Sequence, residues 1–288
     1  MELTSPKTIK NLLEKYGARP FKGWGQNFLI DKSILKKIIE SANLKPNDVV
    51  LEIGPGIGTL TQELAKRAKK VIAVEKDKKM VEILNETVRD FKNIKVIKED
   101  VLKFKTAALN LRNYKLIGNL PFYITSPLIR KFLEKVEVKP RQMILMVQKE
   151  VAQRICALPA RVFAKQKFRR ASRPKMNLLA VSVQFYSKPE ILFYVSKNSF
   201  WPKPKVDGTI LRISRICTNL PRINTNLFFK IVRAGFSQPR KQIVNNLSKM
   251  LKLNKKKTKN WLLENQINPT QRAETLKIRD WLNLTMTY

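Results

Sequence analysis

The run Val49-Val50-Leu51-Glu52-Ile53-Gly54-Pro55-Gly56-Ile57-Gly58 decides the fold class of this chain of 288 residues. Its first five residues, apolar except for Glu52, predict a buried strand, and its three glycines at alternate positions predict a tight loop. The segment from Thr59 to Lys69 then shows helical spacing. A strand, a glycine loop and a helix in this order indicate an α/β sheet that binds a ligand at the loop.

Further apolar runs alternate with helical segments along the chain. Strands are predicted at residues 71–75, 94–97, 114–117 and 143–147, and helices at 77–91 and 125–133. Fully apolar strands that alternate with helices are typical of a parallel sheet covered on both faces. The pattern then predicts three more strands, at residues 178–186, 191–195 and 208–213.

The pattern of the sequence changes near residue 215, after which apolar residues recur at helical spacing. We therefore predict two domains, an α/β domain over residues 1–214 and a small helical domain over residues 215–288. Residues 157–174 interrupt the first domain, and their cations, with no acid among them, predict a basic surface insertion. The basic residues of this insertion are Arg161, Lys165, Lys167, Arg169, Arg170 and Arg173.

The charge of the chain is strongly positive, with 58 Lys and Arg against 22 Asp and Glu and a formal net charge of +36. This excess predicts a polyanionic partner, most simply a nucleic acid, and salt-dependent binding. The absence of histidine excludes His-dependent triads and His metal sites. The spacing of Cys156 and Cys217 argues against a zinc site or a disulfide framework. No secretory signal or membrane span is recognisable, so we expect a cytoplasmic protein.

Acidic residues end three successive predicted strands: Glu52, Glu75 and Asp100. One interpretation is a dinucleotide site, because Glu75 follows the glycine loop by about 20 residues, as does a carboxylate that binds ribose hydroxyls. However, the loop reads Gly-x-Gly-x-Gly, and Pro55 removes an amide that a pyrophosphate would use. A nucleoside without a phosphate fits better. S-adenosylmethionine is such a ligand, and Asp100 would accept a hydrogen bond from its adenine amine.

The turn Asn119-Leu120-Pro121-Phe122 follows a predicted strand and Gly118. It offers a side-chain carbonyl, backbone carbonyls and an aromatic face within four residues. That set suits an extruded purine whose exocyclic amine is to be made reactive. An ordinary strand-to-helix turn is the alternative interpretation.

Taken in order, these segments resemble the small-subunit ribosomal RNA adenine N6,N6-dimethyltransferases. The matching segments are Gln26-Asn27-Phe28-Leu29, Glu52-Ile53-Gly54-Pro55-Gly56, Glu75, Asp100, Asn119-Leu120-Pro121-Phe122, 148–154, 200–207 and 272–276. They cover nearly the whole chain. The resemblance implies a Rossmann-like, seven-stranded class I methyltransferase sheet with a small C-terminal all-α domain. It also implies S-adenosylmethionine as cofactor and dimethylation of two adjacent adenosines near the 3′ end of 16S-type rRNA during ribosome biogenesis.

The resemblance also implies roles for single residues. The cofactor would contact Gln26, Asn27, Leu29, Glu52, Gly54, Gly56, Glu75, Asp100, Val101 and Asn119. Catalysis would depend on Asn119, Leu120, Pro121 and Phe122, and the RNA would contact Phe122, Phe200, Arg240 and Lys241. Phe200 has a second interpretation as an anchor in the core, and Arg240 and Lys241 have one as a charged helix start. No metal is implied, and the partner would be an immature 30S-type subunit bound by a monomer.

The chain departs from the family pattern at three places. Phe122 stands where tyrosine is common, Pro239 stands where a basic residue is usual, and the insertion at 157–174 replaces a shorter turn. Two alternatives remain open. An Erm-type methylase of large-subunit rRNA would share the turn and the glycine loop, although residues 203–207 and 272–274 favour the small subunit. A non-catalytic RNA-binding assembly factor would keep the fold, although the intact acidic strand ends argue against it.

Overall fold

The computed structural model describes residues 1–20, 25–109, 111–159, 175–217 and 223–288. The chain forms two compact units, each of which is described by itself. The first comprises Met1–Ala152 and Ser187–Ile216, and the second comprises Gln153–Tyr186 and Cys217–Tyr288. The sequence analysis placed residues 153–186 before its boundary at residue 214, whereas this division groups Gln153–Tyr186 with the C-terminal residues.

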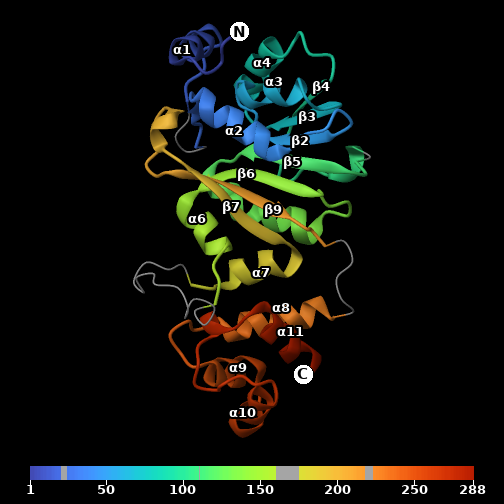
Figure 1. Cartoon of the computed structure of the whole chain (residues 1–288), viewed down its shortest axis with the longest axis vertical. Coiled ribbons are helices and arrows are strands. Elements are labelled where there is room, and N and C mark those ends of the chain that lie inside the picture. Colours follow the sequence, from blue (N-terminus) through green and yellow to red (C-terminus); the bar gives the residue numbers. More distant parts are fainter. Residues whose placement is uncertain (21–24, 110, 160–174, 218–222) are drawn as a thin grey trace. The chain divides into compact units, whose positions relative to one another are not determined.

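A seven-stranded sheet forms the centre of the first unit (Figure 1). Its strands are β2 (Val49–Ile53), β3 (Lys70–Glu75), β4 (Ile94–Lys98), β5 (Tyr114–Asn119), β6 (Gln142–Gln148), β7 (Lys188–Val195) and β9 (Gly208–Ser214). Their order is β4-β3-β2-β5-β6-β9-β7. The first five strands in this order are parallel to one another, as predicted. Strand β9 runs antiparallel to both β6 and β7. The sheet is therefore mixed rather than wholly parallel.

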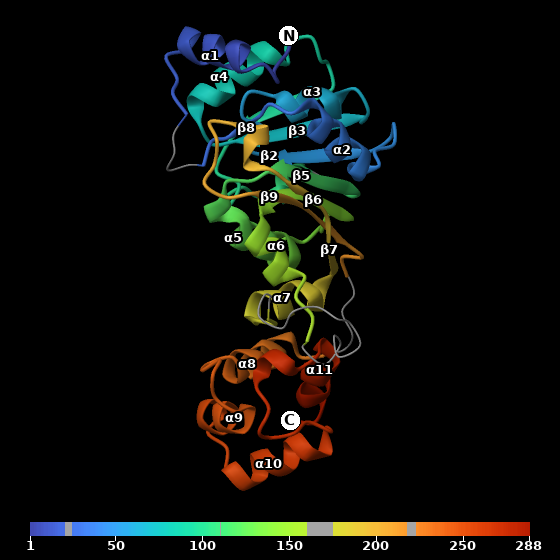
Figure 2. The ribbon, with the colours of Figure 1, turned by 60° about the vertical axis from the view of Figure 1, so that its left-hand side comes forward.

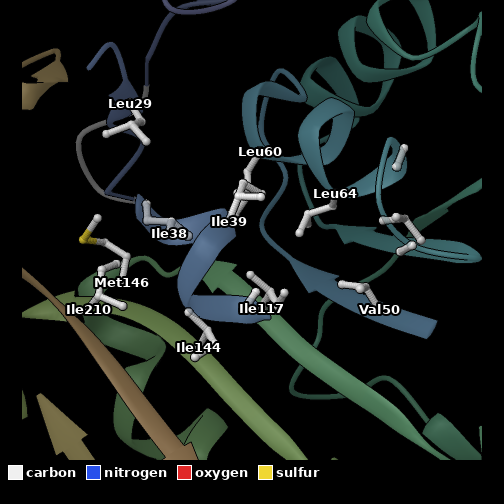
Figure 3. Close-up of a cluster of buried hydrophobic side chains, with 14 of the residues drawn as sticks. Leu29, Ile38, Ile39, Val50, Leu60, Leu64, Ile117, Ile144, Met146 and Ile210 are labelled. Atoms are coloured by element: carbon white, nitrogen blue, oxygen red, sulfur yellow. The ribbon is translucent and has the colours of Figure 1, made fainter. Parts of the chain in front are cut away.

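Both faces of the sheet are buried, which explains why its strands are apolar throughout. Val50, Ile117 and Ile144 point to one face and pack with Ile38 and Ile39 of α2 (Lys32–Ala42), as Figure 3 shows. Leu51, Leu116 and Leu145 point to the other face and are also fully buried. The strands thus lack the alternation of polar and apolar residues that a half-exposed sheet shows.

The helices of the first unit lie on both sides of this sheet. In Figure 2, α2 and α5 lie on opposite sides of the strands. The helical elements are α1 (Pro6–Lys15), α2, α3 (Thr59–Ala65), α4 (Lys78–Thr87), η2 (Thr106–Leu109), η3 (Phe122–Ile124), α5 (Thr125–Arg130), the π-helix η4 (Lys131–Lys135), α6 (Lys149–Ile155), which continues into the second unit, and η7 (Lys197–Ser199). Helices α2 and α4 begin at aspartate caps, Asp31 and Asp77, whose carboxylates accept backbone N–H groups.

A second, two-stranded sheet pairs two segments that are far apart in the sequence. Strand β1 (Phe28–Leu29) runs antiparallel to β8 (Phe200–Trp201), with Leu29 opposite Phe200. The rings of Phe28 and Trp201 stack with centroids 6.5 Å apart. This pairing fixes the segment 25–30 beside the glycine loop.

The second unit is helical. It contains α7 (Leu178–Tyr186), α8 (Thr225–Gly235), α9 (Ile243–Leu251), α10 (Lys255–Glu264), η8 (Ala273–Thr275) and α11 (Ile278–Met286). The predicted strand at 178–186 is therefore wrong. Six of the nine side chains of α7 are buried, and the run is apolar except for Ser182 and Gln184, so its pattern cannot distinguish a buried helix from a buried strand. Within the described ranges, no helix combines the length and apolarity that a bilayer span needs.

Candidate functional site

A pocket of about 150 Å³ opens at the carboxyl ends of strands β2, β3 and β5 in the first unit. The neighbours of β2 are β3 and β5, which lie on opposite sides of it, so the chain crosses over in opposite directions there. Ligands of open α/β sheets bind at this kind of position, because the loops on either side diverge and leave a crevice. The topology therefore explains where the pocket lies.

The glycine loop forms one wall of the pocket. Gly54, Gly56 and Gly58 all have positive φ angles, of 68°, 57° and 93°. A side chain at Gly58 would be strained and would also lie 2.9 Å from Leu84 and Thr87. The run of glycines is thus a requirement of this backbone, and the loop can approach a ligand closely.

Glu75, at the end of β3, is held by the backbone around it. Its Oε2 atom accepts a hydrogen bond from the Gly56 N–H at 3.2 Å, and its Oε1 atom accepts from Lys76 and Asp77 at 2.8 and 3.0 Å. Burial raises the pKa of the Glu75 carboxyl, and these backbone donors oppose the rise. The carboxylate therefore has a fixed orientation beside the glycine loop.

Glu52 is the buried acid of the site. It lies in the interior strand β2, opposite Ala73 of β3 and Ile117 of β5, and its side chain is 1% exposed. Burial, together with the negative charge of Glu75, raises its pKa to about 8. Its Oε2 atom has no hydrogen-bond partner among the described residues, although Glu52 lines the pocket. Such an atom is an acceptor that a bound ligand can satisfy.

Asp100 follows β4, which is an edge strand of the sheet, and lines the pocket. Burial favours its neutral form, but the Leu102 N–H at 2.9 Å and the Lys76 ammonium at 3.1 Å outweigh this effect and lower the pKa of its carboxyl. The sequence analysis missed Lys76 and Tyr123, which also line the pocket. Each directly follows a predicted site residue, and that adjacency was the available signal.

Asn119 ends β5, the strand between β2 and β6. Its side-chain Nδ2 atom donates to the Asn27 carbonyl at 3.2 Å, which leaves the side-chain oxygen to accept from another molecule. The Leu120 N–H donates to the Met146 carbonyl at 3.2 Å. The start of the Asn119-Leu120-Pro121-Phe122 turn is therefore tied to both the segment 25–30 and β6.

The segment 25–30 closes the pocket. The Gln26 Nε2 atom donates to Asp77 at 2.7 Å, and the Asn27 Nδ2 atom donates to the Gly25 carbonyl at 3.0 Å. Leu29 is held by its pairing with Phe200. This segment lies close to the Asn119-Leu120-Pro121-Phe122 turn although it is about 90 residues away in the sequence.

The structure brings the predicted cofactor residues together in one pocket. Gln26, Asn27, Leu29, Glu52, Gly54, Gly56, Glu75, Asp100, Val101 and Asn119 all line it, as does Pro121. Leu120 is buried beside it. Their binding roles stay predictions, but their convergence from five separate segments is a property of the fold.

The predicted substrate residues do not all join this set. Phe200 is 7% exposed and packs in the core around α2, so it does not offer a ring to the pocket. Its pairing with Leu29 buries it, which favours the interpretation as a core anchor. The side chain of Phe122 lies outside what the structure describes, as do residues 160–174 of the insertion. Arg240 and Lys241 are exposed in the second unit, between α8 and α9.

Comparison with known proteins gives consistent results. Residues 21–288 match the model of the family described as ribosomal RNA adenine dimethylase. The chain is 40% identical to ribosomal RNA small subunit methyltransferase A of Dehalococcoides mccartyi over 97% of this chain and 92% of that one. The corresponding protein of Alkaliphilus oremlandii is also 40% identical, over 97% and 95%.

Two solved structures share the fold over most of the chain. The 23S rRNA methyltransferase ErmE matches with a TM-score of 0.69 and 25% identity, over 91% of this chain and 99% of that one. A dimethyladenosine transferase from Plasmodium falciparum matches with a TM-score of 0.68 and 26% identity, over 90% and 96%.

Proposed function

The chain belongs to the ribosomal RNA adenine dimethylase family, and we propose that it dimethylates N6 of two adjacent adenosines near the 3′ end of small-subunit, 16S-type rRNA. S-adenosylmethionine supplies the methyl groups. The observation that carries the proposal is that the Asn119 turn opens into a pocket lined by Glu52, Glu75 and Asp100. The relatives named small subunit methyltransferase A, which align along nearly the whole chain, support the choice of substrate.

The pocket fits S-adenosylmethionine by its chemistry. The Glu75 carboxylate lies where ribose hydroxyls can donate to it, and Asp100 can accept from the adenine amine. The orphaned Oε2 atom of Glu52 suits the positively charged methionine end. The described pocket lining includes four acids, Glu52, Glu75, Glu99 and Asp100, and one basic residue, Lys76, which suits a cationic nucleoside better than a pyrophosphate. The bound cofactor would supply a methyl group on a sulfonium, which is an excellent leaving group.

The chain's own contribution to the reaction is to position the substrate amine. The lone pair of an adenine N6 amine is delocalised into the ring, so the amine is a weak nucleophile. The Asn119 side-chain oxygen and the Leu120 carbonyl would accept its two N–H groups and hold the nitrogen out of the ring plane. These acceptors also lie where positive charge develops on the nitrogen, which stabilises the transition state. Orientation of the amine toward the methyl group supplies further acceleration, and no strong base is needed.

The substrate adenosine must leave its stack to reach this pocket. Extrusion costs a few kcal/mol, and stacking on an aromatic side chain returns about 1–3 kcal/mol per base. Phe122 is the residue that we assign to this stacking. Phe200 would act indirectly by holding the segment 25–30 through the β1–β8 pair.

The partner that we propose is an immature small ribosomal subunit, bound by a monomer of this chain in the cytoplasm. The net charge of +36 favours a large polyanion. Arg240 and Lys241, exposed at the start of α9, would bind phosphates. Phosphate contacts of this kind position an RNA without reading its sequence, so the shape of the folded rRNA would select the target.

The decisive experiment is mass spectrometry of rRNA after incubation of unmethylated subunits with the protein and isotope-labelled S-adenosylmethionine. We expect two adjacent dimethyladenosines in small-subunit rRNA and none in large-subunit rRNA. Label in large-subunit rRNA would favour the Erm-type alternative, which the likeness to ErmE keeps open. Binding to subunits without any binding of S-adenosylmethionine in calorimetry would favour the assembly-factor alternative.

A further inference from the structure

Lys131 joins the helix that follows the Asn119 turn to the loop that follows Asp100. Its ammonium group donates to the carbonyl oxygens of Val101 at 2.7 Å, Leu102 at 3.1 Å and Phe104 at 2.5 Å. We infer that Lys131 is a positioning residue, which holds the loop 101–104 so that Asp100 and Val101 face the adenine of the cofactor. This inference depends on the proposed cofactor, but it assigns a role that neither the sequence motifs nor the lining of the pocket indicate.

The geometry of the loop explains why a cation is needed there. The N–H groups of Lys103 and Phe104 donate back to the Asp100 carbonyl at 2.9 Å each, and the Leu102 N–H donates to the Asp100 carboxylate. This arrangement is one tight turn, and among the described residues no backbone N–H outside the regular elements donates to the carbonyls of Val101, Leu102 and Phe104. Lys131 has three N–H donors and supplies one to each of three carbonyls. The turn is thereby closed at its far end.

The position of Lys131 in the chain connects this contact to the Asn119 turn. The segment that begins at the Asn119-Leu120-Pro121-Phe122 turn continues as η3 and α5 and reaches Lys131 at the start of the π-helix η4. The same helical segment therefore begins at the proposed catalytic turn and ends on the proposed adenine loop. The proposed catalytic turn and the proposed adenine loop are therefore held by the same helical segment, which fixes the distance between them.

The surroundings of Lys131 fit a positioning role better than a surface role. The ammonium is partly buried, and burial lowers its pKa while the charges of Asp100 and Glu99 oppose that change. Val101 and Phe104 are also buried, so apolar packing anchors the loop as well. Apolar contacts are not directional, however, and hydrogen bonds to three carbonyls fix the rotation of the turn and hence the direction of the Asp100 carboxyl.

The test compares Lys131→Met with the wild type by calorimetry and steady-state kinetics. We expect the Kd and the KM for S-adenosylmethionine to rise about tenfold, and kcat and rRNA binding to stay within about twofold. The matched control is Lys135→Met, which removes an exposed lysine from the same π-helix and leaves the loop untouched. Lys131→Arg, which keeps a charged donor, should restore part of the lost affinity.

A second ligand separates positioning from general loss of stability. The probe is a form of S-adenosylmethionine whose purine carries hydrogen in place of the 6-amino group. Wild-type protein should bind it more weakly than the natural cofactor, and Lys131→Met should reduce that discrimination because Asp100 is no longer aimed. Equal Kd values for Lys131→Met and Lys135→Met, or undiminished discrimination in Lys131→Met, would overturn the inference. Failure of the wild type to bind S-adenosylmethionine would instead overturn the proposed function.

Discussion

The side-chain amide of Asn119 has two polar atoms, one bonded to the protein and the other proposed to accept from the substrate amine. The Nδ2 atom donates to the Asn27 carbonyl, which sets the rotation of the amide and turns its oxygen outward. We expect Asn119→Ala to lower methyl transfer by about 10²- to 10³-fold, because an acceptor that acts on developing charge is lost. Single-turnover assays with labelled cofactor measure this change. Binding of rRNA should remain nearly unchanged, and a parallel loss of binding would contradict the role assigned.

Glu52 gives a prediction that depends on pH. Its ordinary carboxyl pKa is 4.5, and in the folded chain burial raises it to about 8, so Glu52 is protonated at neutral pH. Between pH 4.5 and 8 the unfolded chain ionises Glu52 while the folded chain keeps it protonated. The free energy of unfolding therefore falls as the pH rises through this range. A cationic methionine end beside Glu52 favours the charged form and lowers this pKa. We expect binding of S-adenosylmethionine at pH 7 to release a proton.

Calorimetry in buffers of different ionisation enthalpy measures that proton. The matched variant is Glu52→Gln, which keeps the shape of the side chain but cannot ionise. The buffer dependence should disappear in this variant. If Glu52→Gln released as many protons as the wild type, the proton would come from another group and the placement of the methionine end would be wrong.

At the scale of elements, the approach of β5 to β2 determines the shape of the pocket. Gly118 lies opposite Ile53, and a Cβ atom at Gly118 would lie 2.6 Å from the Ile53 carbonyl oxygen. Because that neighbour is backbone, the two strands must separate to admit a side chain. We expect Gly118→Ala to destabilise the fold by about 1–3 kcal/mol and to weaken binding of S-adenosylmethionine. Thermal unfolding and calorimetry test both effects.

Ile117→Val is the control for this prediction. It removes one methyl group from the neighbouring position, where the side chain packs with Ile38 and Ile39 of α2 and does not itself line the pocket. Its stability loss should be about 0.5–1.5 kcal/mol, without a change in cofactor affinity. Normal cofactor binding by Gly118→Ala would show that the strand separation does not reach the glycine loop.

At the scale of the whole molecule, the excess of cations predicts how RNA binding responds to salt. Six cations lie within residues 161–173, and the structure does not describe this segment. We expect their replacement by glutamine, which preserves the length of the chain, to weaken rRNA binding. The slope of log K against log salt should become shallower by up to about 5 if each cation contacts one phosphate.

Binding of a small-subunit rRNA fragment at several salt concentrations gives this slope. The affinity for S-adenosylmethionine should not change, because the pocket is lined by residues 25–146 alone. An unchanged slope would show that the segment makes no phosphate contacts. A shorter deletion variant lacking 161–173 should behave in the same way as the glutamine variant.

The sequence by itself determined the local parts of this protein. The strand at Val49–Ile53, the glycine loop, the acidic strand ends and the Asn119 turn were predictable, because each is set by the conformational limits of a few adjacent residues. The order of these segments along the chain also predicted that they would meet, since parallel strands place their carboxyl ends at one edge of a sheet.

Only the tertiary structure decided what depends on partners distant in the sequence. Residues 178–186 are mostly apolar and show no clear periodicity, so the sequence did not reveal the helix, which packs against α8 and α11. The sequence left Phe200 open as either an RNA contact or a core anchor, and the pairing of β8 with β1 buries it. Nothing in the sequence indicated the role of Lys131, because its carbonyl partners lie 27 to 30 residues away. A side chain's type sets which contacts it can make, but the fold sets which of them lie within reach.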